Sequence, residues 1–191
     1  MNNYLLSVDP SMKNTGFTLW EYIYQHCKCF GNCSCNNIDI WKPIWIGSCS
    51  FKKNSIDNFY RDMHYVIYGT LELKNELTNS KNNFDLIIER GTFHSKNGIG
   101  YETQEHLRGF IAGKFNKLLT KDMLISPSEW KKWYVKKSFS QFEKNFIWIK
   151  NTSIHLANEL IIKQGWNITI SNHDEAESLL IGWYYLNKEN K

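Results

Sequence analysis

The alternation of apolar runs and polar breaks predicts that the chain begins with short strands. Tyr4 to Val8 form an apolar run of strand length, and Asp9-Pro10 opens a turn that Asn14-Thr15-Gly16 completes. Phe17 to Tyr24 resume strand-forming residues, and Trp41 to Phe51 form a third run of this kind. The first fifty residues therefore predict a hairpin followed by a third strand.

The middle of the chain changes to helical spacing and back. After Ser55, apolar residues recur with a helical period at Ile56, Phe59, Met63, Val66 and Ile67. The run FDLIIE, Phe84 to Glu89, is typical of a strand covered on both faces. After a polar loop, a second helical stripe contains Leu107, Phe110, Ile111, Phe115, Leu118 and Leu119. Gly109 and Gly113 lie one turn apart there, so another element could approach closely.

The last third of the chain predicts a brief strand and three helices. Met123 to Ile125 form the strand, and SPSE then starts a helix with Ser126 as its cap. A capping box of Ser140 and Glu143 predicts a longer helix that ends at Gly165. The final helix is expected to begin at Asn172.

This order of elements, three strands, helix, strand, helix, strand and then helices, predicts an α/β fold. The strands would form one mixed sheet with helices on both faces. No repeat or linker divides the chain, so we expect a single domain over residues 1–191.

Composition adds little to this picture but sets its limits. The chain has 23 basic and 19 acidic residues and a formal charge of +4, which permits an anionic partner without requiring one. No apolar run approaches the length of a membrane span, and the first residues lack the pattern of a signal peptide. We therefore expect an intracellular, cytoplasmic protein of a bacterium or of the host compartment of a phage or virus.

Four of the five cysteines cluster in CKCFGNCSC. They are Cys27, Cys29, Cys33 and Cys35. Two Cys-x-Cys pairs in a reducing compartment could hold a thiolate-bound zinc ion, although their spacing is tighter than in the usual zinc knuckle. The alternative is a flexible polar loop between two strands.

Acidic side chains mark the ends of two predicted strands and the start of the last helix. Asp9 and Glu89 each close an apolar strand, and ligands of open α/β sheets bind just beyond such ends. Asp174 and Glu177 are three residues apart and share a helix face. Docking of that face over the strand ends would gather four carboxylates, which repel one another unless cations lie between them. Magnesium fits best, because it prefers oxygen ligands and acts in pairs on phosphodiesters.

These segments resemble the RuvC-type Holliday-junction resolvases of the RNase H-like, or retroviral-integrase, superfamily. The matching motifs are VDPSMKNTG, IIER with the later LRG, and DEAESLLIG, and they occur in the family's order over nearly the whole chain. Glu177 stands where the family usually has aspartate, and Ser178 replaces the usual alanine. The cysteine segment, at about residues 25–40, is similar to nothing in the family pattern and is interpreted as an insertion.

The resemblance implies a fold, a site and an activity. The fold would be a five-stranded RNase H-like sheet with three antiparallel strands and then two parallel ones. Asp9, Glu89, Asp174 and Glu177 would form a catalytic tetrad that binds two Mg²⁺ ions, with Mn²⁺ as a substitute. A homodimer would cut four-way DNA junctions symmetrically by hydrolysis and leave 5′-phosphates. A histidine serves in the final helix of some members, so His173 is a second candidate there.

Basic residues in two segments are candidates for DNA contact. The segment SPSEWKKWYVKKSFSQFEK carries five lysines interleaved with aromatic residues: Lys131, Lys132, Lys136, Lys137 and Lys144. By the resemblance, Lys131 or Lys144 would assist at the scissile phosphate. The loop after Glu89 adds Arg90, Phe93 and Lys96, with Phe93 placed to stack on junction bases. The alternatives are a solvated helix face for the lysines and a buried loop anchor for Phe93.

Two other functions remain open from the sequence. One is an RNase H-like nuclease of different specificity, for flaps, branched DNA or RNA–DNA hybrids. The other is a DNA-binding module without catalysis, although such a module gains nothing from carboxylates beside phosphate.

Overall fold

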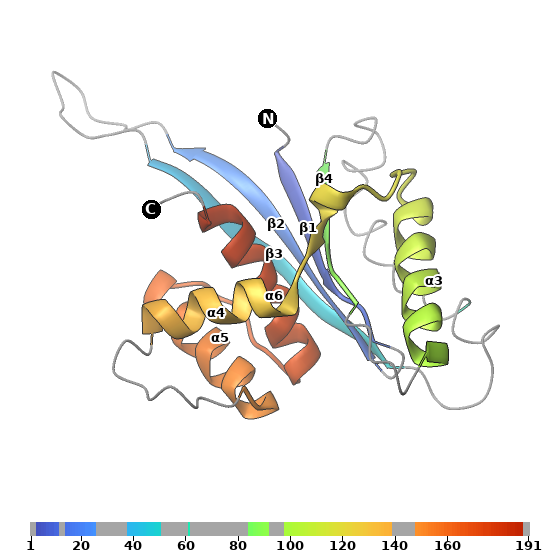
Figure 1. Ribbon diagram of the computed structural model, residues 1–191. Coiled ribbons are helices and arrows are strands. Elements are labelled where there is room, and N and C mark those ends of the chain that lie inside the picture. Colours follow the sequence, from blue (N-terminus) through green and yellow to red (C-terminus); the bar gives the residue numbers. More distant parts are fainter. Residues whose placement is uncertain are drawn as a thin grey trace, which may run out of the picture.

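A five-stranded sheet forms the centre of the computed structural model (Figure 1). The structure describes residues 3–11, 14–25, 38–50, 61, 84–91, 98–138 and 148–188. In spatial order the strands are β3 (Ile38–Ser50), β2 (Asn14–Gln25), β1 (Tyr4–Asp9), β4 (Phe84–Glu89) and β5 (Leu124–Ile125). Pro43, which cannot donate to a ladder, lies in β3 at the edge of this sheet.

The pairing directions confirm the predicted mixed sheet. β2 pairs antiparallel with both β1 and β3, whereas β4 pairs parallel with both β1 and β5. In the β1–β4 register Val8 lies opposite Ile88, one residue before the acid that ends each strand. The two strand-end carboxyl groups therefore lie at the same edge of the sheet.

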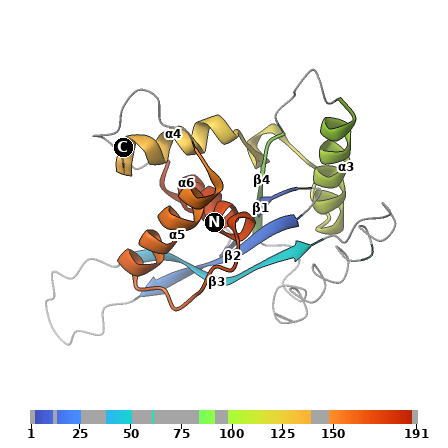
Figure 2. The same cartoon turned by 90° about the horizontal axis from the view of Figure 1, so that it is seen from below.

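Helices cover both faces of the sheet, as predicted. On one face, Leu6 and Val8 of β1 pack against Leu107 and Ile111 of α3 (Gly98–Lys114). On the other face lie α6 (His173–Asn187), α5 (Lys150–Gln164) and α4 (Pro127–Ser138) (Figures 1 and 2). Because side chains alternate along a strand, Asp9 points to the same face as Leu5, which packs in the core under α6.

Close packing contacts fix the position of α6 on the sheet. A Cβ added at Gly182 would collide with Trp20 and Ser7, and one added at Gly16 would collide with the backbone carbonyl of Asp174. The Ser7 hydroxyl donates to the Ser178 carbonyl oxygen at 2.8 Å, and the Trp20 indole donates to the Ser7 hydroxyl at 2.9 Å. The helix is therefore held in one position along the sheet by glycine contacts and buried hydrogen bonds.

One close approach that the sequence allows does not occur, and two predictions about helices were wrong. Gly109 and Gly113 have open space around them, so no other described element approaches α3 there. Leu118 lies beyond the end of α3 and is 85% exposed. The helix predicted to start at Ser140 is not continuous, because Ile149 has extended backbone angles and α5 begins at Lys150.

Other predictions about helix ends were confirmed or lie outside the described residues. The Asn172 side chain caps α6 by accepting from the N–H groups of Asp174 and Glu175 at 3.0 Å each, and Gly165 ends α5 with φ 65°. The helix predicted after Ser55, the capping box of Ser140 and Glu143, and the cysteine segment fall on residues that are not described. No described helix is long and apolar enough to cross a membrane.

Candidate active site

Three of the four predicted acids meet at the carboxyl ends of β1 and β4. Asp9 and Glu89 come from these neighbouring parallel strands, and Glu177 comes from the second turn of α6 above them. Each residue offers one carboxylate oxygen, and these oxygens all lie within 4.8 Å of one another. Such a group of oxygen ligands from three elements could hold a divalent metal ion.

Asp174 lies beside this group but not within it. Its carboxylate accepts from the Asn14 amide at 2.6 Å, and its other oxygen lies 3.2 Å from the His173 ring. Its negative charge still reaches Asp9, where it contributes to raising the pKa. The structure therefore places the fourth predicted acid next to the other three, tied to the start of β2.

The electrostatics of the group favour a bound cation. Burial, and then the charges of the neighbouring carboxylates with Glu89 first, raise the pKa of Asp9 well above its usual range. Burial and then the charge of Glu177 raise the pKa of Glu89 as well. Since a divalent ion would offset both the repulsion and the lost hydration, the chemistry of these residues fits the metal that the sequence predicts.

Hydrogen-bond donors from α4 and α5 hold two of the carboxylates. The Trp130 indole N–H donates to Glu89 Oε1 at 2.9 Å. The Ser153 hydroxyl donates to Glu177 Oε1 at 2.7 Å and accepts from the Trp148 indole at 2.9 Å. Ser153 and Trp148 carry no signal in the sequence, because their role depends on how α5 docks onto α6.

Lys131 is the predicted basic residue that the structure brings to the carboxylates. Its ammonium group lies 3.5 Å from Glu177 Oε1. It also lies over the rings of Trp130 and Trp148, at 4.8 and 5.6 Å from their centroids. These contacts place one positive charge at the edge of the acidic group, and the charge of Lys131 contributes to lowering the pKa of Glu89.

Arg108 is a buried residue that sequence analysis used only as part of the LRG match. Its Nε donates to the backbone carbonyl oxygen of Glu89 at 2.7 Å, and its Nη1 pairs with Glu105 Oε1 at 2.9 Å. A Cβ added at Gly91 would lie 2.8 Å from the same guanidinium group. Arg108 therefore fixes the end of β4 to α3, on the face of the sheet opposite α6.

The other residues predicted to contact DNA are either exposed on described elements or lie outside the described residues. Lys132 and Lys136 are exposed and one turn apart on α4, which also contains Lys137, and Arg90 is exposed just after β4. Trp130 and Tyr134, two of the aromatic residues interleaved with these lysines, are buried in the core. Phe93, Lys96, Lys144 and the four clustered cysteines lie outside the described residues.

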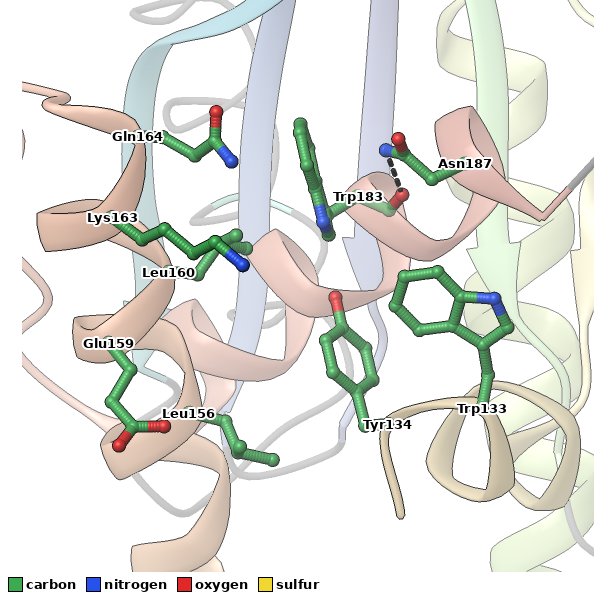
Figure 3. Close-up of a pocket in the computed structure, with 9 residues that line it drawn as sticks. All are labelled: Trp133, Tyr134, Leu156, Glu159, Leu160, Lys163, Gln164, Trp183 and Asn187. Atoms are coloured by element: carbon green, nitrogen blue, oxygen red, sulfur yellow. Dashed lines mark hydrogen bonds between the residues drawn. The ribbon is translucent and has the colours of Figure 1, made fainter. Parts of the chain in front are cut away.

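A cavity of about 490 Å³ lies elsewhere in the helical layer, between α4, α5 and α6 (Figure 3). Trp133, Tyr134 and Trp183 form its aromatic walls, and the Lys163 side chain extends into it. The Tyr134 hydroxyl is satisfied by the Leu180 carbonyl oxygen at 2.9 Å. None of the predicted site residues lines this cavity, so it is separate from the carboxylate group.

Comparison with known proteins identifies the fold. No family model matches the sequence, and no curated protein matches it. Among solved structures, Thermus thermophilus RuvC matches with a TM-score of 0.53 and 10% identity, covering 97% of this chain and 96% of that one. A complex of T. thermophilus RuvC with a Holliday junction substrate matches with the same TM-score and identity, over 96% of this chain and 95% of that chain.

The protein has a RuvC-type fold. The agreement extends over nearly the whole of both chains, and it includes the mixed sheet whose parallel strands β1 and β4 carry Asp9 and Glu89. In this RuvC-type fold, the final helix α6 brings Glu177 over the strand ends. The resemblance read from four short motifs is thus confirmed at the level of the fold.

Proposed function

We propose that the protein is a metal-dependent endodeoxyribonuclease that resolves four-way DNA junctions by paired, symmetric hydrolysis of phosphodiesters. The observation that carries this proposal is the convergence of Asp9, Glu89 and Glu177 within 4.8 Å on a RuvC-type fold. A partly buried cluster of carboxylates is costly for folding, and metal-dependent hydrolysis of phosphodiesters is a reaction that requires such a cluster.

The site residues have distinct parts in this proposal. Asp9, Glu89 and Glu177 would hold Mg²⁺ or Mn²⁺, with Asp174 as an adjacent fourth carboxylate. The metal, when bound, supplies an activated water and stabilises charge on the leaving oxygen. Lys131 offers a positive charge beside Glu177, where it can approach a phosphate. Lys132 and Lys136 present an exposed basic face on α4 for the DNA backbone.

The remaining parts of the proposal concern assembly. A symmetric cut of both strands requires two sites, so we infer a homodimer of single-domain chains, 1–191. The cysteine segment at about 25–40 would be an insertion in that domain and a candidate zinc site. Mass measurement under native conditions tests the dimer, and metal analysis of the purified protein tests the zinc.

The decisive experiment offers several nucleic acids side by side. Synthetic four-way junctions, flaps, linear duplexes and RNA–DNA hybrids are incubated with the protein and Mg²⁺. We expect the junctions to be cut preferentially, at symmetric positions and with ligatable ends. Preferential cutting of flaps or hybrids would show an RNase H-like nuclease of other specificity, and binding without any cutting would show a DNA-binding module.

Substitution of Asp9 tests the metal site directly. We expect Asp9→Asn to abolish cleavage, by at least about 10³-fold, while junction binding in gel-shift experiments survives, because only a metal ligand is removed. Glu159→Gln is the matched control, since this acid is largely exposed and lies on α5 away from the carboxylate group. An Asp9→Asn enzyme that remains active would contradict the proposed site.

A further inference from the structure

Two indole groups and one hydroxyl group meet behind the carboxylates. We propose that Trp130, Trp148 and Ser153 form a positioning unit that orients Glu89 and Glu177 toward a metal ion and so sets the metal affinity of the site. This inference rests on the proposed metal-dependent function and extends it to residues that would act through the carboxylates: Trp130 and Ser153 donate to them, and Trp148 donates to Ser153.

The direction of each hydrogen bond follows from the chemistry of the groups. An indole N–H can only donate, so the Ser153 hydroxyl must accept from Trp148. The hydroxyl has a single proton, and that proton is then directed to Glu177 Oε1 at 2.7 Å. Trp130 donates in the same way to Glu89 Oε1 at 2.9 Å. Each glutamate therefore has one oxygen held by a donor from the helical layer, which restricts the rotation of its carboxylate.

The unit is rigid because its members are packed against one another. Trp130 and Ser153 have no exposed surface, and the rings of Trp130 and Trp148 meet edge to face with centroids 5.1 Å apart. Trp130 lies on α4, Trp148 just before α5 and Ser153 on α5. The unit thus links a carboxylate of the sheet to one of α6 through two further helices.

Positioning matters more at this site than at an ordinary carboxylate. Glutamate has three rotatable side-chain bonds, one more than aspartate, so the carboxylates of Glu89 and Glu177 can adopt many orientations unless partners hold them. A magnesium ion requires near-ideal octahedral geometry, so a freely rotating carboxylate binds it poorly. Removal of partners that orient metal ligands typically costs about 10- to 100-fold in metal affinity.

The test measures Mn²⁺ binding to the full chain by isothermal titration calorimetry, in the absence of DNA. We expect Ser153→Ala and Trp130→Phe each to weaken Mn²⁺ binding by about 10-fold or more, and Trp148→Phe to weaken it less. Trp166→Phe is the matched control, because this buried indole packs on Trp20 and Trp183 away from the carboxylates. It should lower the melting temperature and leave Mn²⁺ affinity unchanged.

A double-mutant cycle separates positioning from a general structural role. The indole N–H of Trp148 acts on Glu177 through the Ser153 hydroxyl, and phenylalanine at this position keeps an aromatic ring under Lys131, so Trp148→Phe should have little further effect on Mn²⁺ affinity once Ser153 is alanine. Wild-type affinity in folded Ser153→Ala and Trp148→Phe, or fully additive losses, would overturn the proposal. Because the readout is metal binding, it fails or succeeds independently of whether the chain prefers junctions.

Discussion

At the scale of single residues, Asp9 has a buried carboxyl group that is surrounded by other acids. Burial comes first among the causes that raise its pKa, followed by the charges of Glu89, Glu177 and Asp174. In the unfolded chain the same carboxyl loses its proton near pH 3.8. Between that pH and the raised pKa, the folded protein binds more protons than the unfolded chain, which makes stability fall as pH rises.

We therefore expect the free energy of unfolding of the metal-free protein to decrease from about pH 4 toward neutral pH. Each unit by which the Asp9 pKa is raised costs about 1.4 kcal/mol of stability at pH values above the raised pKa. Thermal melting across this pH range measures the effect, and saturating Mg²⁺ should reverse it. Asp9→Asn should flatten the profile and raise metal-free stability. An unchanged profile in that variant would show that the Asp9 carboxyl is not the source of the pH dependence.

Single residues also show the limit of what sequence predicts. Asp9 and Glu89 are recognisable because an acid at the end of an apolar strand is conspicuous. Trp130 stands among the lysines of α4, and the spacing there does not reveal that its ring is buried and that its indole donates to Glu89. Ser153 and Trp148 have no local signal, because only the docking of α5 on α6 gives them their partner.

At the scale of elements, the position of α6 on the sheet determines where Glu177 lies. Ser178, which departs from the alanine of the resembled family, shares a hydrogen bond with Thr18 at 2.8 Å between their hydroxyls. Ser7 also donates to the backbone of Ser178, so polar groups under the helix are paired. These contacts set the height of α6 above β1 and β2, and with it the distance from Glu177 to the strand ends.

A pair of glycine substitutions tests how closely α6 packs on the sheet. Gly182→Ala places a methyl group against Trp20 and Ser7, so we expect it to destabilise the protein by about 1–3 kcal/mol and to reduce metal affinity. Gly109→Ala on the open face of α3 should instead stabilise it by about 0.5–1 kcal/mol through helix propensity. Chemical denaturation and Mn²⁺ titration measure both effects. Equal responses of the two variants would show that α6 is not closely seated.

The ends of helices are predicted best where the sequence carries a local capping or terminating residue. Asn172 and Gly165 set the start of α6 and the end of α5, because a cap and a left-handed glycine are local signals. The helix predicted from Ser140 was wrong since apolar spacing continues across Ile149, whereas the backbone there is extended. The sequence allows close glycine contacts on α3, but they occur under α6, a difference that depends on tertiary packing alone.

At the scale of the whole molecule, the exposed lysines of α4 bear on DNA binding. Replacement of Lys132 and Lys136 by glutamine should weaken junction binding and reduce the slope of log affinity against log salt by about 0.9 for each phosphate that is no longer neutralised. Binding measured over a series of salt concentrations yields the slope. Lys163→Gln, at the far end of α5, is the matched control and should leave the slope unchanged. An unchanged slope in the α4 variant would place the DNA elsewhere.

The order of strands in the sheet is predictable because the local patterns and the order of the motifs point to the same topology. A tight hairpin, a third strand and two later strands separated by a helix leave few topologies, and the motif order selects the one observed. Only 10% identity accompanies the structural match, so the agreement lies in the fold rather than in shared residues.

The parallel pairing of β1 with β4, capped by α6, also governs when the site can exist during synthesis. Asp9 emerges from the ribosome early, Glu89 near the middle, and Glu177 only with the last helix described. Contacts so distant along the chain form late, after the loops between them have closed. A growing chain therefore carries two acids without their third partner, and it acquires the complete carboxylate group only after α6 has been made and has docked.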